Sequence, residues 1–193
     1  MYLPVLSAAP ATQPISLSEA KSHLRVDGDD EDTMIDLLIA GAVDHIDGWS
    51  GILGRCLVTQ TWEIYADSFA KLMRLPLAPI ASIDSIKVTD SSAIVTTIAA
   101  ANYDLYADGL GSFVRFKDAY SFPSDLAEVQ AISISFVAGY GAAADVPGAI
   151  KSALLLMIGH AYEHRESVVT GTIATELPMS AASLLAPYRR VGI

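Results

Sequence analysis

The residues best suited to chemistry stand in the string His160-Ala161-Tyr162-Glu163-His164. Two histidines four positions apart share one helix face, and with Glu163 they follow the spacing of the inverted zinc-protease motif, so metal binding is geometrically feasible. Such a site needs a further carboxylate from downstream, where only Glu166 and Glu176 remain, in an expected turn or extended segment. The alternative is a helix that becomes polar as it ends, with cationic groups where the helix dipole favours them. On that interpretation we expect no metal and no cofactor.

Other motifs that could support chemistry are incomplete. The acidic stretch Asp27–Asp32 suggests a calcium loop, but its glycine is in the second position and Leu38 stands where the closing Glu is needed. These carboxylates are better explained by the N-terminus of the next helix, where the dipole favours them. Gly139-Tyr140-Gly141 lacks the lysine of phosphate loops, and Cys56 has no evident His/Asn pairing. We therefore predict that the protein is not an enzyme.

The composition is that of a folded, acidic protein. Of 193 residues, 52% are hydrophobic and 18% are charged, which is well outside the disordered range. A formal net charge of −10, from 12 basic and 22 acidic residues, argues against binding nucleic acid through its phosphates, because that needs clustered Lys and Arg. A surface that DNA merely slides past is compatible with such acidity. The single cysteine excludes an internal disulfide and fits a reducing compartment.

The N-terminal part of the chain predicts an arm followed by two helices. The first residues contain three prolines and no basic side chain, so they make a poor signal peptide, and we expect 1–15 to be a flexible or extended arm. Ser16-Leu17-Ser18-Glu19 is a capping box that begins a short helix. Apolar residues at three- and four-residue spacing predict a second helix from about Asp30 to Trp49. Residues 16–56 are thus the first part of a helical core.

Beyond the second helix the hydrophobic period becomes that of strands. Trp62 and Ile64 fall on one face, and Thr61 and Glu63 fall on the other. The strand candidates, separated by turn signals, are Thr59–Tyr65, Lys71–Leu75, Ile83–Thr89, Tyr103–Tyr106, Ser112–Phe116 and Gln130–Val137. Such regular short strands predict an antiparallel sheet, either a small barrel or a sandwich. We interpret residues 57–141 as a β lobe inserted between helical segments.

A strongly apolar helix follows the lobe. Asp145 is its expected N-cap, and Pro147 stands near the first turn, where its missing N–H costs nothing. A helix that is apolar on all sides must be covered on all sides, by its own fold or by neighbouring subunits. The residues assigned to this core or subunit interface are Ile150, Leu154, Leu155, Met157, Ile158 and Tyr162. The stretch spans about 20 residues at most and has charged residues at both ends, which indicates a buried helix and not a membrane span.

The chain ends with a short helix. An amphipathic pattern predicts a helix over Ser180–Arg190, which Pro187 should truncate. Residues 142–193 are then the second part of the helical core, with a C-terminal tail. The predicted fold class is α+β: two N-terminal helices, a long buried helix and a short C-terminal helix form a core that carries an inserted antiparallel β lobe.

Several stretches occur in a specific order: Leu17–Asp47, Leu57–Phe69, Leu75–Val88, Val137–Gly141, Asp145–Val169 and Leu184–Arg190. In this order and spacing, the chain resembles the head-tail connector (adaptor) proteins of long-tailed phages, prophages and gene transfer agents. The likeness covers nearly all the chain after about Ser16. That family has no catalytic residues to carry over, and some members lack most of the β region, which fits its interpretation as an insertion.

The resemblance implies a structural connector. Its helical core is expected to assemble as a dodecameric ring beneath the portal protein, in the neck of the virion. Before assembly the protein is expected in the host cytoplasm. The implied partners are further copies of the chain, the portal and a neck or tail-completion protein, with DNA passing through the lumen without specific binding and no membrane. We expect the C-terminal tail, with Tyr188, Arg189 and Arg190, to order on binding the portal. The alternative is a non-catalytic binding module whose β lobe binds a tail protein or a small ligand.

Overall fold

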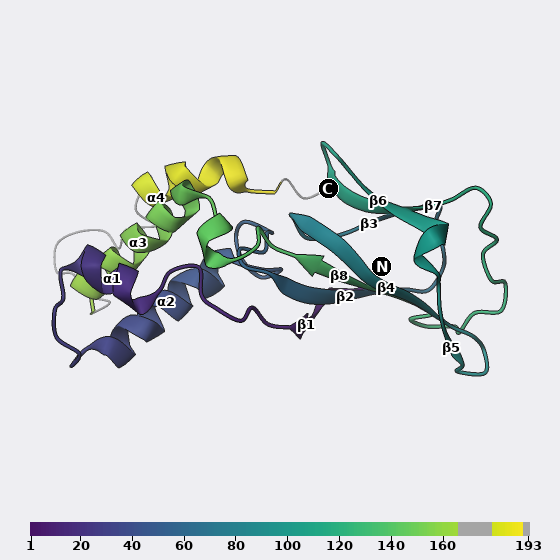
Figure 1. The fold of residues 1–193 in the computed structure, drawn as a ribbon, viewed down its shortest axis with the longest axis horizontal. Coiled ribbons are helices and arrows are strands. Elements are labelled where there is room, and N and C mark those ends of the chain that lie inside the picture. The colour runs from purple at the N-terminus through teal and green to yellow at the C-terminus, as the bar shows by residue number, and fades with distance from the viewer. Residues whose placement is uncertain (166–178, 191–193) are drawn as a thin grey trace. The chain divides into compact units, whose positions relative to one another are not determined.

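The computed structural model describes residues 1–165 and 179–190, which divide between two compact units. The helical unit comprises Thr12–Val58 and Gly141–Arg190, and the β unit comprises Met1–Ala11 and Thr59–Tyr140 (Figure 1). Helices and antiparallel strands are therefore both present and segregated along the chain. The predicted α+β fold class is confirmed.

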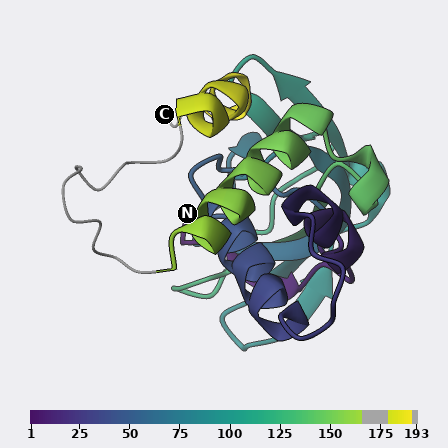
Figure 2. The ribbon, with the colours of Figure 1, turned by 90° about the vertical axis from the view of Figure 1, so that its left-hand side faces the viewer.

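The helical unit is organised around one central helix. Its α-helices are α1 (Leu17–Leu24), α2 (Asp32–Ile46), α3 (Gly148–Glu163) and α4 (Met179–Leu185), and its 3₁₀ turns are η2 (Ala143–Asp145) and η3 (Ala186–Tyr188). Helix α3 contacts each of the other three helices (Figure 2). Its residues Ile150, Leu154 and Ile158 are fully buried, as the apolar periodicity requires. None of the helices among the described residues is both long and apolar enough to cross a membrane.

The predicted capping box at Ser16 is confirmed and also links two helices. The Glu19 amide donates to the Ser16 hydroxyl at 3.2 Å, and the Glu19 carboxylate accepts from the Ser16 amide at 2.8 Å. The other oxygen of Glu19 lies 2.7 Å from the ammonium of Lys151 on α3. The Lys151 hydrogen bond and those from Ser16 lower the pKa of Glu19 to about 2. One carboxylate thus caps α1 and holds it against α3.

The start of α3 differs from the prediction. Pro147, and not Asp145, is the N-cap, while Asp145 ends the preceding 3₁₀ turn. The Asp145 carboxylate accepts a hydrogen bond from the Ala142 amide at 2.9 Å and so closes that turn. Because Asp145 stands two residues before the N-cap and its carboxylate already accepts from Ala142, it does not cap α3. Sequence patterns place caps only to within a residue or two.

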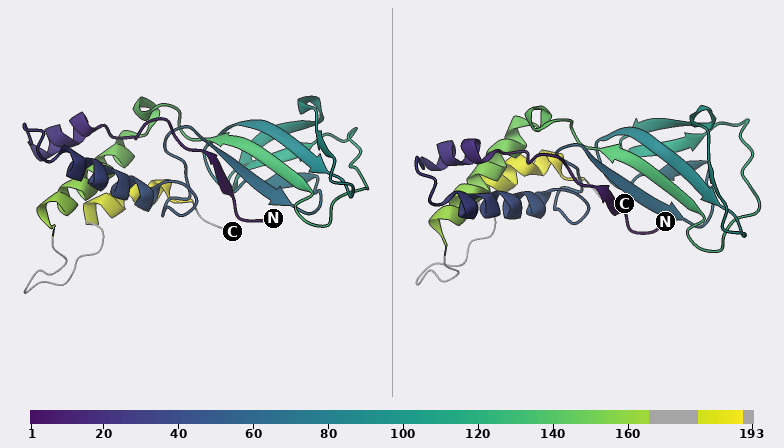
Figure 3. Two further views of the ribbon diagram at one scale, coloured as in Figure 1. Left: turned by 90° about the horizontal axis from the view of Figure 1, so that it is seen from below. Right: turned by 60° about the horizontal axis from the view of Figure 1, so that its bottom comes forward.

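The β unit holds two antiparallel sheets, as expected for the sandwich alternative. The strands are β1 (Val5–Ala8), β2 (Gln60–Ala66), β3 (Leu72–Arg74), β4 (Ile80–Thr89), β5 (Val95–Thr97), β6 (Tyr103–Asp108), β7 (Gly111–Phe116) and β8 (Ile132–Ala138), with the 3₁₀ turn η1 (Ala100–Asn102) before β6. They form a five-stranded sheet of order β1-β2-β8-β4-β5 and a three-stranded sheet of order β3-β7-β6, and all the pairs are antiparallel (Figure 3). The arrangement is a layered one, as in a sandwich, and not one closed barrel.

The central strands show why the alternation in the sequence was informative. Burial alternates residue by residue along β2 and β8, so that Trp62 and Ile64 are buried while Thr61 and Glu63 are partly exposed. In β8, Ile134 and Phe136 are buried in the same way and stand opposite Ile64 and Trp62. This row of apolar cross-strand pairs forms the centre of the β unit.

The N-terminal segment is not a flexible arm, which corrects that part of the prediction for residues 1–15. Val5–Ala8 is an edge strand paired with β2. The Tyr2 hydroxyl donates to the Asp67 carboxylate at 2.8 Å, and the Gln130 amide donates to the same oxygen. Further along, Ile15 is buried in the helical unit. The strand character of this segment depends on pairing with residues more than fifty positions away in the chain, so the local sequence does not reveal it.

We expect Glu19→Gln to destabilise the protein in a pH-dependent manner. Because folding lowers the pKa of Glu19 from 4.5 to about 2, the stability that its carboxylate contributes is fully present above pH 4.5 and is lost as the pH falls towards 2. Urea unfolding should therefore show a difference between Glu19→Gln and wild type at pH 7 that shrinks at pH 3. Ser16→Ala, which removes the cap, should cost about 1 kcal/mol at pH 7.

The exposed Glu163 supplies the matched control, because Glu163→Gln also removes one carboxylate from a helix of the same unit. Its unfolding free energy should stay close to that of wild type at both pH values. Equal losses in Glu19→Gln and Glu163→Gln would mean that the capping box does not carry this stability.

Candidate functional site

The loop after α2 folds back on itself into a compact turn, which holds the end of the chain. The Gly48 amide donates to the Arg55 carbonyl at 2.7 Å, and the Leu57 amide donates to the Asp47 carboxylate at 2.6 Å. Gly51 lies so close to the end of α2 that a Cβ there would stand 2.3 Å from the Asp47 carbonyl oxygen. Only glycine fits at that approach.

The C-terminal tail is seated on this loop. The Arg55 guanidinium donates to the Tyr188 carbonyl oxygen, and the Arg190 amide donates to the Leu53 carbonyl at 2.9 Å. We call the loop Asp47–Arg55 together with residues 186–190 the clasp. The Arg55 side chain and the Leu53 carbonyl thus hold the residues on both sides of Arg189 within the chain. That Tyr188, Arg189 and Arg190 order on binding the portal stays a prediction.

The clasp gathers side chains suited to contact with another protein. Trp49 is 44% exposed on its loop, and Arg189 is exposed on the tail. Arg55, Arg189 and Arg190 bring three of the twelve basic residues of an acidic chain into this one segment pair. Aromatic and arginine side chains are the types enriched in protein interfaces. Neither Trp49 nor Arg55 was assigned to a functional site from the sequence.

The residues assigned to the α3 core or subunit interface fall into two groups. Ile150, Leu154 and Ile158 are inaccessible and pack inside the chain. Leu155 and Met157 are only partly buried, so their side chains retain surface for a further contact. Tyr162 is also partly buried, and its hydroxyl donates to the Glu31 carboxylate.

The end of α3 continues that link to α2. Arg165 bonds the second oxygen of Glu31 at 2.7 Å, and its guanidinium lies over the Tyr162 ring at 4.7 Å from the centroid. The Tyr162 and Arg165 hydrogen bonds lower the pKa of the Glu31 carboxylate. Tyr162 therefore links the end of α3 to the start of α2 by a hydrogen bond.

The candidate catalytic and metal-binding residues do not converge within the described part of the chain. His160 and His164 stack with ring centroids 4.5 Å apart, and Nδ1 of His164 lies 3.0 Å from the His160 carbonyl oxygen. Glu166 and Glu176, the only downstream carboxylates, lie outside the described residues. Across residues 1–165 and 179–190, no group of three or more His, Cys, Asp or Glu side chains could hold a metal ion. Cys56 is fully buried.

The acidic turn before α2 is satisfied from within the chain. The Lys21 ammonium lies 2.7 Å from the Asp29 carboxylate and 2.6 Å from the Asp32 carboxylate. These hydrogen bonds raise the pKa of Lys21. An internal cation thus bridges two carboxylates that a calcium loop would direct at its ion.

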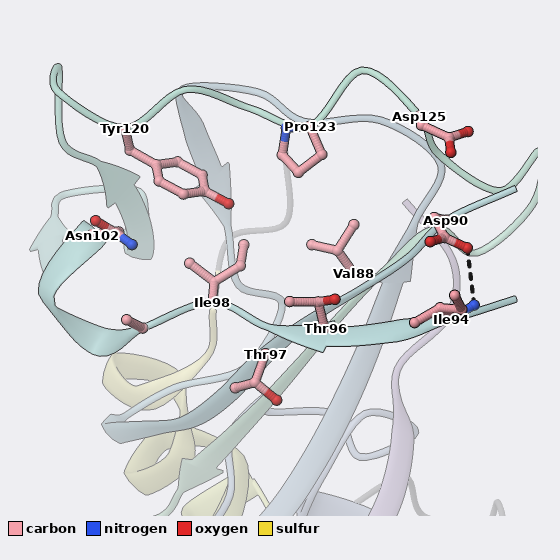
Figure 4. A pocket seen from close by; sticks show the side chains of 11 residues that line it. Val88, Asp90, Ile94, Thr96, Thr97, Ile98, Asn102, Tyr120, Pro123 and Asp125 are labelled. Carbon is pink, nitrogen blue, oxygen red and sulfur yellow. Dashed lines mark hydrogen bonds between the residues drawn. The ribbon is translucent and has the colours of Figure 1, made fainter. Parts of the chain in front are cut away.

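The β unit has a pocket of about 410 Å³ beside β5 (Figure 4). Tyr120 and Pro123 lie on one side of it, while Val88 and Ile98 lie on the other. Of its acidic lining residues, Asp90 accepts hydrogen bonds from the amides of its own turn, at Ser92 and Ile94. Its lining contains two carboxylates and no cationic side chain, which disfavours anionic ligands. Nothing in it favours the alternative of a small-ligand module.

A family model matches the part of the chain that carries α1, α2, the strands β2 to β5 and nearly all of β6. The match extends over residues 14–107, and the family is described as phage gp6-like head-tail connector protein. Over this range the chain is similar to the phage head-tail connector family. No curated protein sequence matches it.

Solved structures extend the likeness to the whole chain. A chain in the neck of an empty gene transfer agent particle, computed with C6 symmetry, superposes with a TM-score of 0.81 at 20% identity, covering 100% of this chain and 97% of that chain. A chain in the virion of a native gene transfer agent particle gives 0.79 at 19%, and one in a native neck computed with C12 symmetry gives 0.72 at 17%, both with the same coverage. At these identities the likeness establishes a shared fold.

Two glycines of α2 and its following loop provide a test of the clasp. Gly51→Ala should lower the unfolding free energy by about 1–3 kcal/mol, because its Cβ can be accommodated only by moving the backbone of Ile46 and Asp47. Gly41 is the matched control, since nothing lies within 4 Å of a Cβ there, and Gly41→Ala should stabilise the helix by about 0.5–1 kcal/mol. Chemical denaturation measures both. A neutral Gly51→Ala would contradict the close approach.

Proposed function

We propose that the protein is the structural connector between head and tail of a tailed phage or gene transfer agent particle. It forms a ring beneath the portal, DNA passes through this ring, and the neck and tail assemble on it. The observation that carries the proposal is the match to the connector family over residues 14–107, together with a full-length fold shared with chains of gene transfer agent necks. The chain is made in the host cytoplasm and ends in the virion.

The charge of the chain supports this role. With a net charge of −10, copies arranged around a lumen would repel the phosphates of passing DNA and prevent it from sticking. The symmetry of the similar neck structures supports a cyclic assembly, of six-fold or twelve-fold symmetry. The partly buried Leu155 and Met157 of α3 are candidates for the contact between neighbouring helical units.

We propose that the clasp is the surface that binds the portal. Because Tyr188 and Arg190 are already held by the Leu53–Arg55 segment, the clasp offers Arg189 and Trp49 in a fixed geometry, which lowers the entropic cost of binding. Its cationic side chains favour an acidic patch on the partner.

The assembly state tests the connector role directly. Light scattering on a sizing column, followed by imaging of any large species with and without the portal of the same particle, should reveal a closed ring. The chain should also be present at the neck of purified particles. A protein that stays monomeric even with the portal and is absent from particles would overturn the proposal.

A charge reversal tests the clasp. Arg189→Glu should weaken binding to the portal at least about tenfold, equivalent to about 1.4 kcal/mol, because it opposes an acidic patch and leaves the backbone hydrogen bonds of the clasp intact. Arg115→Glu is the control, since Arg115 is an exposed arginine on β7 in the β unit. The affinity of each variant for portal protein immobilised on a sensor surface should be measured at two salt concentrations. Equal affinities for the two variants would assign portal binding to another surface.

A further inference from the structure

The two edges of the five-stranded sheet are unusual because both are open and apolar. Its outermost strands are β1 and β5, and among the described strands neither has a second partner. Every residue of both strands is exposed. On one edge Leu3 and Val5 are 70% and 53% exposed, and on the other Ile94 and Val95 are 62% and 59% exposed.

Neither edge carries the charges that normally prevent sheets from pairing. The first charged side chain of the protein is Glu19, and none occurs between Asp90 and Asp104. Solitary sheets protect their edges with lysines, inward-pointing charges or bulges, because unpaired N–H and C=O groups are a template for another strand. β1 has its short length, flanking prolines and one register irregularity between Leu6 and Ala8, but no charge. β5 lies in an uncharged run rich in Ile, Val and Thr. Such edges are suited to pairing with a strand of another protein chain.

We propose that β5 of one copy pairs with β1 of the next copy, so that the five-stranded sheets join edge to edge around the ring. This inference rests on the ring of the proposed function, and it specifies how the β units of neighbouring copies contact one another in that ring. The two edges differ, so the contact is head-to-tail, which is the kind of interface that closes into a ring. The occupant of each edge is thus a second copy of this chain.

Charge favours this contact over others. Copies that each carry a net charge of −10 repel one another, and the two uncharged edges are segments at which neighbours can approach with little repulsion. The strand directions are also determined. Four successive antiparallel pairings separate β1 from β5, so the two strands run the same way in the sheet. Neighbours in a ring of many subunits differ by a small rotation, so the new pair is parallel.

Cross-linking tests the pairing, because the only native cysteine is buried. Val5→Cys and Val95→Cys are introduced together in one chain, and purified particles are treated with a short bismaleimide that bridges two thiols. We expect a ladder of covalent multimers that extends well beyond dimers, since each chain has one reactive thiol on each edge. Each single variant should remain monomeric, and particles assembled from a mixture of the two should give dimers and nothing larger.

The outcomes separate this inference from the connector role. Particles that contain the double variant but give only monomers on treatment would overturn the edge pairing and leave the connector role standing. Dimers from a single variant would overturn the head-to-tail arrangement. Absence of the wild-type chain from particles would overturn both.

A second measurement uses charge. Val5→Lys and Val95→Lys should each abolish the ring peak in light scattering. Where the ring forms only in particles, each should prevent incorporation of the chain into them. Leu110→Lys should do neither. Leu110 is similarly exposed, at 50%, but lies in the turn between β6 and β7. Mixing the two lysine variants should restore dimers only, because one intact β5 and one intact β1 remain to pair. Full assembly by either lysine variant would contradict the proposal.

Discussion

The helical unit depends on the burial of α3. Its Ile150, Leu154 and Ile158 have no exposed surface, and α1, α2 and α4 all contact this helix. Polar links then fix its two ends: Lys151 bonds Glu19 of the capping box near the start, and Tyr162 and Arg165 bond Glu31 near the end. Apolar burial supplies most of the stabilisation, and the terminal hydrogen bonds determine the register in which the helices pack.

Features that depend on local sequence were predictable, and features that depend on distant partners were not. The capping box at Ser16 and the alternating burial of Trp62 and Ile64 follow from short-range stereochemistry, and both were confirmed. β1 was read as an arm because its strand character comes from pairing with β2. The seating of Tyr188 on Arg55 was missed for the same reason, since more than a hundred residues separate them.

The candidate sites differ in the same way. The His160–His164 spacing was visible in the sequence, but spacing along one helix cannot supply the further ligands that a zinc centre needs. The clasp has no motif of its own, because it forms where a tight loop brings arginines from two distant segments together. In the clasp the fold positions ordinary side chains that no local pattern marks.

The sheet topology also brings the two ends of the long β segment close together. The long β segment leaves the helical unit at Thr59 and returns at Tyr140, and its first and last strands, β2 and β8, are direct neighbours with Gln60 opposite Ala138. Paired residues of adjacent antiparallel strands have Cα atoms only about 5 Å apart. Some eighty residues therefore occupy a gap that a short turn could close, so the segment enters and leaves the helical unit at almost one point.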